Sequence, residues 1–493
     1  MTEARTIEAD GAAPAVTVPL TVDLDGTLSR TDTLHEALLR LAARAPFDLL
    51  NVQAELKNGR EAFKRAVADR VVVPREDLCL DDDVIAHVQA ARADGRKTIL
   101  ISASDHRQVE AAVDGLDLFD EVIGTGSEGT EGQNLKGDAK AAYLEGRFGA
   151  GGFDYIGDAE VDAPVWAVAR EAITARADAR IKEIAEGANV NTRHIGMPRT
   201  RAGLADAIVR ALRPRQWVKN LLIFLPMAAA HSMESLLAVV AAFLAFSMTA
   251  SSVYVVNDLL DLSADRAHPR KRFRPFAAGE VTATQGLAVA AGLILGALAL
   301  SLALTPPAFL AWLGIYYVAT FAYSAWLKRK LIVDVMTLAG LYTVRIIAGA
   351  AAATVVLSPW MLGFSMFLFL ALAAIKRQAE LVDLFKSDKS AAAGRAYEAD
   401  DLPVLRGIAL SSSHAAVLVL SLYITSDAVQ PLYDRPQLLW IVAPLLLYWL
   451  IRMVMKTHRG HMTDDPIVFA ARDKTSLAVI AASGLAVLAA AVL

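Results

Sequence analysis

Residues 234–275 read ESLLAVVAAFLAFSMTASSVYVVNDLLDLSADRAHPRKRFRP, an apolar run followed at once by acids and then by bases. The run 234–256 is long enough to cross a bilayer as one α-helix, since about 20 apolar residues span the hydrocarbon core. Similar runs recur through the second half of the chain. We therefore expect an all-α membrane domain with nine spanning helices, at residues 218–232, 234–256, 284–304, 307–326, 332–353, 358–375, 407–425, 437–455 and 475–492.

The first half of the chain has a different character. Residues 1–212 carry charged side chains in nearly every block of ten, whereas the long apolar runs start after about residue 217. A chain of 493 residues with this division is expected to hold at least two domains. We expect a disordered N-terminus (1–17), an α/β domain (18–190), a linker with an interfacial helix (191–213) and the membrane domain (214–493).

The distribution of charge predicts partners and orientation. The net charge of −4 gives no sign of a nucleic-acid partner, and the single cysteine, Cys79, excludes an intrachain disulfide. Within the second half, the loops on the opposite side of the membrane contain only one basic residue, Arg435. By the positive-inside rule, the basic loops and the first half of the chain should face the cytoplasm. Nine spans would then place the C-terminus on the outer side of the cell (inner) membrane. The basic loops are 257–283, 327–331, 376–406 and 452–474.

The motif DLDGTL at residues 23–28 follows a short apolar stretch in the first half. Short strands alternate there with helical stretches, which predicts a parallel α/β sheet of the Rossmann type. A carboxylate at the end of such a strand is well placed for chemistry. Asp23 could attack phosphorus, and Asp25 could protonate the leaving oxygen and then deprotonate the attacking water. The expected strands are 19–22, 98–102, 121–123 and 153–156.

Further motifs follow in order and complete a phosphoryl-transfer set. Ser102 ends the strand KTILIS and could bind a phosphate oxygen, with Ser104 as the alternative. Lys140 could neutralise the phosphate and the nucleophile, with Lys136 as the alternative. Acids after the strand 153–156 could hold Mg²⁺, which prefers a few carboxylates together with waters and phosphate oxygens. The expected metal ligands are Asp23, Asp25, Asp158 and Asp162.

The order of these motifs resembles the haloacid dehalogenase superfamily over about residues 18–190. The resemblance implies a Mg²⁺-dependent phosphatase with the roles given above and a helical cap inserted near residues 30–90. In that family the second acid of the first motif marks phosphatases, and Asp25 stands at this position. A purely regulatory domain is the alternative.

The acidic run after residue 256 predicts a second site. Asp258, Asp261 and Asp265 have the spacing i, i+3, i+7, so their carboxylates should share one face of a helix. Clustered carboxylates repel one another unless cations hold them together, and Mg²⁺ that bridges to a diphosphate would do so. Bases just downstream could take the remaining phosphate charge. These bases are Lys271, Arg272 and Arg274.

This run resembles NDxxDxxxD, the first signature of the UbiA superfamily of intramembrane prenyltransferases. The resemblance covers about residues 210–493 and implies a Mg²⁺-dependent transferase. Members usually carry a second Asp-rich motif in the loop after the fourth span. Here that loop reads YSAWLKRKLIVD, a YxxxxK pattern with Tyr323, Lys328 and the single acid Asp334.

The departure from the second motif favours one branch of the superfamily. An acidic site suits a metal-bound diphosphate, whereas a basic site with a tyrosine suits a monophosphate held directly. Together with RPRQWVKNLL at 213–222, this pattern resembles the branch that transfers phosphoribose from phosphoribosyl pyrophosphate to a polyprenyl phosphate of the decaprenyl type. The resemblance implies that the lipid is the acceptor. The phosphatase domain would then remove the 5-phosphate and yield polyprenyl-phosphoryl ribose, a precursor of cell-wall arabinan.

Other polar residues near the cytoplasmic membrane face are candidates for substrate binding. Arg345 lies inside an expected span, where a charge is costly and usually functional, and Asp334 is its expected neighbour. His268 is expected to orient other groups by hydrogen bonds. The remaining candidates are Lys219, Asn220, Asn257, Arg266, Lys376 and Arg377.

Two other functions stay open. One is a conventional prenyltransferase that moves a prenyl group from its diphosphate to an aromatic or lipid acceptor. The other is a non-enzymatic role of the first half as a tethering or regulatory module. The missing second acidic motif argues against the former, and the intact phosphatase motifs argue against the latter. The sequence leaves a homo-oligomer open.

Overall fold

The computed structural model describes residues 17–130, 133–198, 200–386, 396–427, 429–462 and 465–492. The residues expected to be disordered lie outside this description, except for residue 17. The chain divides into two compact units. The first is Met1–Ala211 with Asp258–Leu287, and the second is Leu212–Asn257 with Ala288–Leu493.

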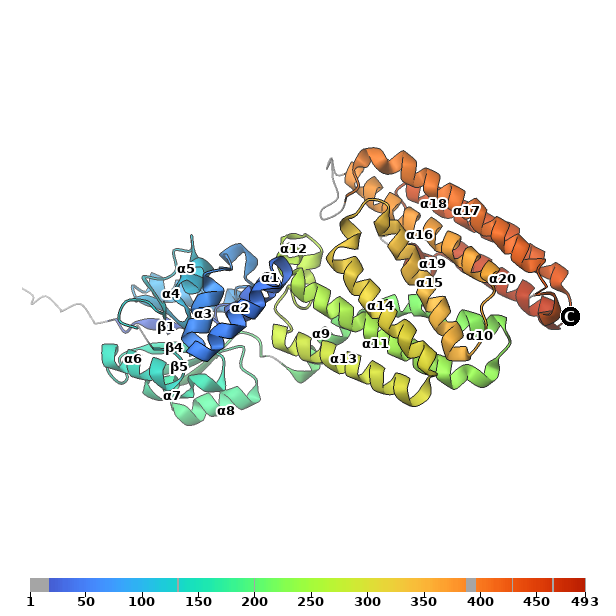
Figure 1. The fold of residues 1–493 in the computed structure, drawn as a ribbon. Coiled ribbons are helices and arrows are strands. Elements are labelled where there is room, and N and C mark those ends of the chain that lie inside the picture. Colours follow the sequence, from blue (N-terminus) through green and yellow to red (C-terminus); the bar gives the residue numbers. More distant parts are fainter. Residues whose placement is uncertain are drawn as a thin grey trace, which may run out of the picture. The chain divides into compact units, whose positions relative to one another are not determined.

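A six-stranded parallel sheet with the order β3-β2-β1-β4-β5-β6 forms the centre of the first unit (Figure 1). Along β2, Ile99 and Ile101 pack into one buried apolar cluster and Leu100 into another, because successive side chains of a strand point to opposite faces. Burial on both faces is typical of parallel sheets and confirms the predicted α/β class. The strands are β1 (Leu20–Val22), β2 (Thr98–Asp105), β3 (Glu121–Thr125), β4 (Asp154–Gly157), β5 (Glu171–Ala175) and β6 (Thr192–Ile195).

Helices inserted between β1 and β2 occupy the region where a cap was expected. The first of them, α1, starts after Asp32, whose side chain accepts a hydrogen bond from the His35 amide and so caps the helix. The helices of this unit are α1 (Thr33–Arg44), α2 (Asp48–Ala54), η1 (Glu55–Asn58), α3 (Arg60–Ala68), η2 (Arg75–Asp77), α4 (Asp82–Ala93), α5 (His106–Val113), α6 (Asp138–Phe148), η3 (Glu160–Asp162), α7 (Ala163–Val168), α8 (Ala179–Ala188), α9 (Arg201–Leu212), α12 (Leu262–Ala267) and η6 (Lys271–Phe273).

The Ala- and Arg-rich composition of residues 171–213 predicts helix on both sides of a polar break at Asn189–Arg193, but the structure has strands in two places. Strand β5 lies between β4 and β6, and its alanines at 172 and 175 are buried, so pairing with neighbouring strands overrides the helix propensity of alanine. Strand β6 is a partly exposed edge strand with the sequence TRHI, which lacks an apolar alternation. The sheet therefore continues past the expected boundary at residue 190, whereas α8 and α9 are helical as predicted.

Long apolar helices dominate the second unit (Figure 1). In the described part of the chain, eight helices are long and apolar enough to cross a membrane, and they correspond to eight of the expected spans. Their α-helical parts are α11 (Leu236–Leu260), α13 (Ala283–Leu304), α14 (Pro307–Ala325), α15 (Val333–Ala353), α16 (Pro359–Lys386), α17 (Leu402–Ile424), α18 (Val442–His458) and α20 (Lys474–Val492). Shorter helices are α10 (Leu225–Ala229), α19 (Pro466–Ala470), η4 (Pro214–Phe224), η5 (Met233–Ser235), η7 (Leu327–Arg329), η8 (Ala399–Asp401), η9 (Gln430–Leu432) and η10 (Pro436–Ile441).

The first expected span, 218–232, is not one long helix, so the prediction of nine long spanning helices is not confirmed. This region divides into the 3₁₀ helix η4 and the short helix α10. Pro226 has no N–H, and its ring would clash with the carbonyl four residues earlier, so an α-helix cannot run undisturbed through this point. His231 then adopts a positive φ of 53°, which ends the helical path.

Candidate active sites

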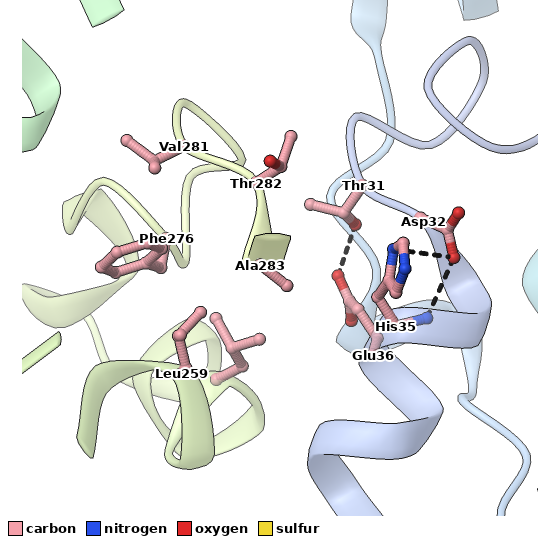
Figure 2. A pocket seen from close by; sticks show the side chains of 10 residues that line it. Thr31, Asp32, His35, Glu36, Leu259, Phe276, Val281, Thr282 and Ala283 are labelled. Carbon is pink, nitrogen blue, oxygen red and sulfur yellow. Dashed lines mark hydrogen bonds and ion pairs between the residues drawn. The ribbon is translucent and has the colours of Figure 1, made fainter. Parts of the chain in front are cut away.

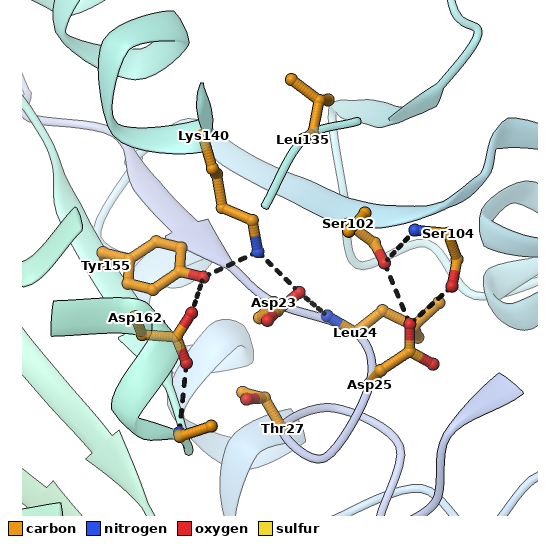
Figure 3. Close-up of polar contacts among 12 residues, drawn as sticks. Asp23, Leu24, Asp25, Thr27, Ser102, Ser104, Leu135, Lys140, Tyr155 and Asp162 are labelled. Carbon is orange, nitrogen blue, oxygen red and sulfur yellow. Dashed lines mark hydrogen bonds and ion pairs between the residues drawn. The ribbon is translucent and has the colours of Figure 1, made fainter. Parts of the chain in front are cut away.

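The turn after β1 carries the predicted nucleophile (Figure 3). Lys140 on α6 is buried, and its Nζ lies 2.9 Å from Asp23 Oδ1. The same ammonium donates a hydrogen bond to the hydroxyl of Tyr155 at 2.9 Å. Lys136 lines the same cavity. Of the two candidate lysines, Lys140 is therefore the one that contacts Asp23.

The carboxyl group of Asp23 is electrostatically unusual. Burial raises its pKa to about 7 against the opposing Lys140 ammonium, and the carboxylates of Asp162 and Asp25 raise the pKa as well. An additional cation at this site would favour the ionised carboxylate that nucleophilic attack requires.

Asp25 is held by both the sheet and the start of α1. Its Oδ2 accepts hydrogen bonds from the hydroxyls of Ser102 (3.1 Å) and Ser104 (2.7 Å), and its Oδ1 accepts one from the Thr33 amide (2.7 Å). Ser104 is also 3.1 Å from the Thr33 hydroxyl. Both candidate serines hydrogen-bond to Asp25. This contact therefore does not show which of the two binds a phosphate oxygen.

The acids after β4 have two different environments. Asp162 accepts hydrogen bonds from the Tyr155 hydroxyl (2.8 Å) and from the amides of Asp158 (3.1 Å) and Ala159 (3.2 Å), so both of its oxygens hold the loop in place. Asp158 reaches the turn after β1. A Cβ on Gly26, which has a φ of +82°, would lie 2.5 Å from the Asp158 carboxylate oxygens, so only glycine fits at this position. Asp158 therefore packs against this turn, whereas Asp162 lines the same cavity as Asp23 and its carboxylate helps to raise the Asp23 pKa.

A cavity of about 430 Å³ opens over the turn. Asp23, Asp25, Ser102 and Lys140 line one part of it, with the Lys136–Gly137 segment nearby. The inserted helices and the segment before them supply other lining residues, which are Asp32, Leu34, His35, Leu56, Arg60, Phe63 and Lys64. All of the predicted phosphatase residues except Asp158 therefore line one cavity.

The acidic motif after α11 lies in segment 258–287, which belongs to the first compact unit. The helix is interrupted at Asp261, whose φ of −98° and ψ of 14° separate α11 from α12, so the expected single helix face is not found. Asp258 and Asp265 are buried, and both accept hydrogen bonds from Nη1 of Arg274, at 3.2 and 2.6 Å. Asp261 is exposed. One guanidinium thus bridges two of the three carboxylates.

Arg266 has a packing role in this structure. Its guanidinium is almost fully buried and donates to both carboxylate oxygens of Glu36 on α1, at 2.7 and 2.8 Å, and to the carbonyl of Ala277 at 3.0 Å. It therefore joins segment 258–287 to the inserted helices and is not free for the phosphate contact that the sequence suggested.

Glu36 also lines a small cavity of about 20 Å³ (Figure 2). Thr31, Asp32 and His35 accompany it on one side, and the other side is largely apolar. This volume holds about one water molecule, so the cavity is too small for a substrate. The other lining residues are Leu259, Leu262, Phe276, Val281, Thr282 and Ala283.

The remaining residues of the basic run lie at the surface of this unit. His268 Nδ1 accepts hydrogen bonds from the amides of Arg270 (3.1 Å) and Lys271 (3.3 Å) and so shapes the turn, as expected of an orienting group. The side chains of Lys271 and Arg272 are exposed, and Arg272 lies over the Phe273 ring. Exposed cations next to a carboxylate pair can meet the outer oxygens of a diphosphate.

Both carboxylate sites can be compared with the needs of Mg²⁺. Among the residues that the structure describes, no group of three or more His, Cys, Asp and Glu side chains is arranged to hold a metal ion. Mg²⁺ needs fewer protein ligands, because it keeps several waters and takes phosphate oxygens. The raised pKa of Asp23 and the guanidinium shared by Asp258 and Asp265 both mark places where a cation lowers electrostatic repulsion. The donor chemistry of both sites fits Mg²⁺.

In the second unit, Arg345 of α15 is a buried cation with neutral partners. Its Nε donates to the Asn220 amide oxygen at 2.9 Å, its Nη2 to the Tyr316 hydroxyl at 3.0 Å, and its Nη1 to the Leu341 carbonyl at 2.5 Å. The guanidinium also lies over the rings of Tyr316 and Tyr342. Asn220 in turn donates to Ser247 at 3.0 Å. No carboxylate contacts Arg345 within the described residues.

Two further cations lie in the second unit around one acid. Lys219 of η4 pairs with Asp465, and Lys376 of α16 lies 3.6 Å from the same carboxylate. Despite burial, these ammonium groups lower the pKa of Asp465 to about 2, so the carboxylate stays charged. Lys219 Nζ lies 5.9 Å from the centre of the Tyr342 ring, which Arg345 also contacts. Among the residues that the structure describes, the cluster Lys219–Lys376–Arg345 therefore has three cations for one carboxylate.

The YxxxxK segment belongs to a separate polar cluster. Tyr323 donates to Asp334 at 2.9 Å, and Arg377 donates to the Tyr323 hydroxyl at 2.8 Å and to Asp334 at 3.0 Å. Arg377 also pairs with Glu380. Asp334 is therefore a partner of Arg377, and the expected neighbour relation with Arg345 is wrong. Of the other candidates, Lys328 is half-buried in η7, and Asn257 donates to Ser324 at 2.9 Å.

The second half of the chain matches a known family. Residues 221–490 match the model of the UbiA prenyltransferase family, which is more than half of the chain. This chain belongs to the UbiA prenyltransferase family. The membership agrees with the resemblance carried by the acidic motif and with the apolar helices of the second unit.

Several relatives of this UbiA family member extend the comparison. The uncharacterized protein y4nM of Sinorhizobium fredii is 34% identical over 465 residues, 93% of this chain and 88% of that protein. The nodulation protein NoeC of Azorhizobium caulinodans is 35% identical over 277 residues, 55% of this chain and 88% of that protein. Decaprenyl-phosphate phosphoribosyltransferase of Mycobacterium tuberculosis is 38% identical over 231 residues, 45% of this chain and 75% of that enzyme. The first alignment runs through both units.

Some partners in the UbiA family member were missed by sequence reasoning. Tyr342 precedes Arg345 by three residues, a spacing that places both on one helix face and was a usable signal. Asp465 precedes a proline, which is typical of a helix cap, but this pattern does not reveal Lys219 as its partner. No sequence signal points to Tyr155 or Tyr316 as hydrogen-bond partners.

Proposed function

We propose that the membrane domain transfers 5-phosphoribose from phosphoribosyl pyrophosphate to a polyprenyl phosphate, and that the N-terminal domain then removes the 5-phosphate. The observation that carries the first step is the excess of cations over carboxylates around Tyr342 among the described residues of the second unit. A buried charge whose partners are all neutral is costly, so an anionic substrate would compensate Arg345. The lipid phosphate supplies such an anion.

The relatives support this choice of reaction. The Mycobacterium tuberculosis enzyme at 38% identity is named a decaprenyl-phosphate phosphoribosyltransferase. A conventional prenyltransferase is less well supported, because the only acid of the YxxxxK segment, Asp334, is engaged by Arg377 and Tyr323. That acid is therefore poorly placed to hold a second metal of a prenyl diphosphate.

The proposed transfer needs little proton chemistry. A phosphate oxygen of the lipid attacks the anomeric carbon, the bond from this carbon to the pyrophosphate oxygen breaks, and pyrophosphate leaves with the electron pair. The acceptor is already an anion, so positioning and charge stabilisation dominate. Mg²⁺ bound at Asp258, Asp261 and Asp265 would neutralise the diphosphate. Arg274, which bridges two of these acids, could then contact the diphosphate directly.

The geometry at Asp23 supports the proposed phosphatase step. Its carboxylate attacks the phosphorus of the 5-phosphate, and the ribose oxygen leaves with a proton from Asp25. Water then attacks the aspartyl-phosphate, returns a proton to Asp25 and releases inorganic phosphate. Lys140 stabilises the anionic phosphoryl group, since it already contacts Asp23 at 2.9 Å. The product is polyprenyl-phosphoryl ribose, a precursor of cell-wall arabinan.

The expected setting is the cell membrane, with the N-terminal domain in the cytoplasm. The basic loops of the second half support this orientation. Both substrates are then within reach of the cytoplasm, because phosphoribosyl pyrophosphate is soluble and the lipid phosphate lies at the membrane face.

The test is a reconstituted assay with the purified full chain, phosphoribosyl pyrophosphate, a polyprenyl phosphate and Mg²⁺, read by mass spectrometry of the lipids. The wild type should form polyprenyl-phosphoryl ribose. The variant Asp23→Asn should accumulate the 5-phosphate form, and Asp258→Asn should form neither product. Chelation of Mg²⁺ should stop both steps. Unchanged phosphate release by Asp23→Asn would refute the second step. Transfer of a prenyl group from a prenyl diphosphate would refute the first.

A further inference from the structure

The cavity over Asp23 contains cations that the phosphatase step does not use. Arg60 and Lys64 of α3 and Lys136 before α6 line this cavity together with Lys140. Lys140 already pairs with Asp23. The side chains of Arg60 and Lys136 are exposed, and neither has an ion-pair partner among the described residues. Their charge is therefore available to a ligand.

Lys64 is fixed in place by neutral groups. Its ammonium donates to the side-chain oxygen of Asn134 at 2.8 Å and to the carbonyl of Ala103 at 2.5 Å. These contacts orient the side chain across the cavity without cancelling its charge. A phosphate oxygen could therefore meet an ammonium whose position is already set.

The acids of the same cavity are engaged in internal contacts. Asp25 is bonded to Ser102, Ser104 and the Thr33 amide, and Asp162 is bonded to Tyr155 and two amides. Asp32 caps α1 and lies 3.3 Å from His35 Nδ1. The acids are thus held by the protein, whereas Arg60 and Lys136 have no anionic partner among the residues that the structure describes.

Apolar side chains accompany these cations. Leu56 is 52% exposed although it lines the cavity, and Phe63 and Leu34 are half-buried there. Cations next to apolar surface suit a phosphodiester that carries a hydrocarbon chain, because the phosphate can contact the cations and the chain can pack on the apolar side chains.

Resting on the phosphatase step proposed above, we propose that Arg60, Lys64 and Lys136 form a second anion subsite. With the 5-phosphate at Asp23, this subsite binds the phosphodiester at the anomeric carbon of the same ribose. Leu56 and Phe63 contact the first part of the prenyl chain. The domain is then selective for sugar phosphomonoesters that carry a second, lipid-linked phosphate.

The test compares phosphate release by the purified full chain from three related substrates. These are methyl ribofuranoside 5-phosphate, ribofuranosyl 1-(methyl phosphate) 5-phosphate, and ribofuranosyl 1-(geranyl phosphate) 5-phosphate. Relative to the first, kcat/KM should rise about tenfold or more for the second, the scale of one charge-assisted hydrogen bond, and further for the third. The comparison thereby separates the contribution of the second phosphate from the contribution of the hydrocarbon chain.

Variants assign the effect to the subsite. Arg60→Gln and Lys136→Gln should each lower the ratio of kcat/KM between the second and first substrates by about fivefold to tenfold. Leu56→Ser should lower the ratio between the third and second substrates. Lys57→Gln removes a neighbouring cation that does not line the cavity, and it should leave these ratios as in the wild type.

The outcomes separate this inference from the phosphatase proposal. Equal kcat/KM for the first two substrates, with ratios unaffected by Arg60→Gln and Lys136→Gln, would overturn the second subsite and leave the phosphatase in place. Release of phosphate from none of the three substrates would overturn both. If Lys57→Gln lowered the ratio of kcat/KM between the second and first substrates as much as Arg60→Gln and Lys136→Gln, the effect would come from general surface charge. This result would also overturn the subsite.

Discussion

Arg345 is the single side chain on which the proposed lipid-phosphate site depends most. Its hydrogen-bond partners are Asn220, Tyr316 and a backbone carbonyl, all of them neutral. A charge buried among neutral groups destabilises a fold, so its presence is best explained by an anion that binds there. Arg377, in contrast, is buried against Asp334 and pairs with Glu380.

The two arginines should respond differently to substitution. Arg345→Gln should lower kcat/KM for phosphoribosyl transfer by about 100-fold while leaving the thermal unfolding temperature unchanged or higher, because it removes an uncompensated charge. Arg377→Gln should instead destabilise the fold by about 3–5 kcal/mol, since it removes the guanidinium that compensates the buried Asp334 carboxylate. Transfer rates and unfolding temperatures in the same detergent check this. A parallel loss of stability and activity in Arg345→Gln would contradict a substrate role.

The grouping of residues in space was predictable where a motif stands at the end of a strand. Asp23, Asp25, Ser102 and Lys140 share one cavity, as the motif order suggested. The packing role of Arg266 was not predictable, because its partner Glu36 lies 230 positions away in the sequence. Hydrogen-bond partners from remote segments leave no local pattern.

The approach of η4 to α15 depends on one glycine. A Cβ at Gly349 would lie 2.2 Å from the carbonyl oxygen of Ile223, so no other residue fits without a shift of the backbone. Gly340, on the same helix, has no atom within 4 Å of such a Cβ. Gly349 and Gly340 of helix α15 therefore form a matched pair for substitution by alanine.

Gly349→Ala should destabilise the second unit and lower transferase activity, because η4 carries Lys219 and Asn220. In a helix without such a contact, Gly→Ala stabilises by about 1 kcal/mol. Gly340→Ala should therefore be neutral or stabilising. The thermal unfolding temperatures of the two variants in detergent test this. Equal unfolding temperatures would show that η4 does not pack closely on α15.

The ion pair between α1 and α12 predicts a double-mutant result. Arg266→Met or Glu36→Met alone should each cost about 3–5 kcal/mol, because either leaves a buried charge unpaired. The double variant should recover much of that loss. Arg270→Gln, an exposed neighbour, is the control and should change stability little. Additive losses in the double variant would contradict a direct pair.

Helices and strands could be predicted from the sequence where their apolar pattern was long. Eight expected spans correspond to observed helices because each is a sustained apolar run. Strands β5 and β6 were missed, since they are short and the first is rich in alanine. Sheet pairing with neighbours, which no local window contains, decides their structure.

At the scale of the whole molecule, the number of membrane crossings depends on residues 214–229. A 3₁₀ helix rises about 2.0 Å per residue and an α-helix about 1.5 Å, so η4 and α10 together reach about 30 Å, the thickness of the hydrocarbon core. This region can therefore cross the membrane although it is not one long α-helix. Nine crossings then remain our proposal.

Cysteine labelling tests this topology. In a Cys79→Ser background, which keeps a donor for the Ala278 carbonyl, Ser232→Cys should react with a membrane-impermeant maleimide added outside intact cells. Lys330→Cys, in a basic loop, should react only after the membrane is opened. Protection of Ser232→Cys in intact cells, with labelling after opening, would show that residues 214–229 return to the cytoplasmic side.

The first compact unit is discontinuous in sequence, since segment 258–287 joins residues 1–211 from between two apolar helices. A cut in the gene after codon 211 would therefore not produce two self-contained products. The upstream product would lack part of its own packing surface, and the downstream product would carry Arg266 without its acid partner. Co-expression of the two fragments should recover less folded protein than the intact reading frame.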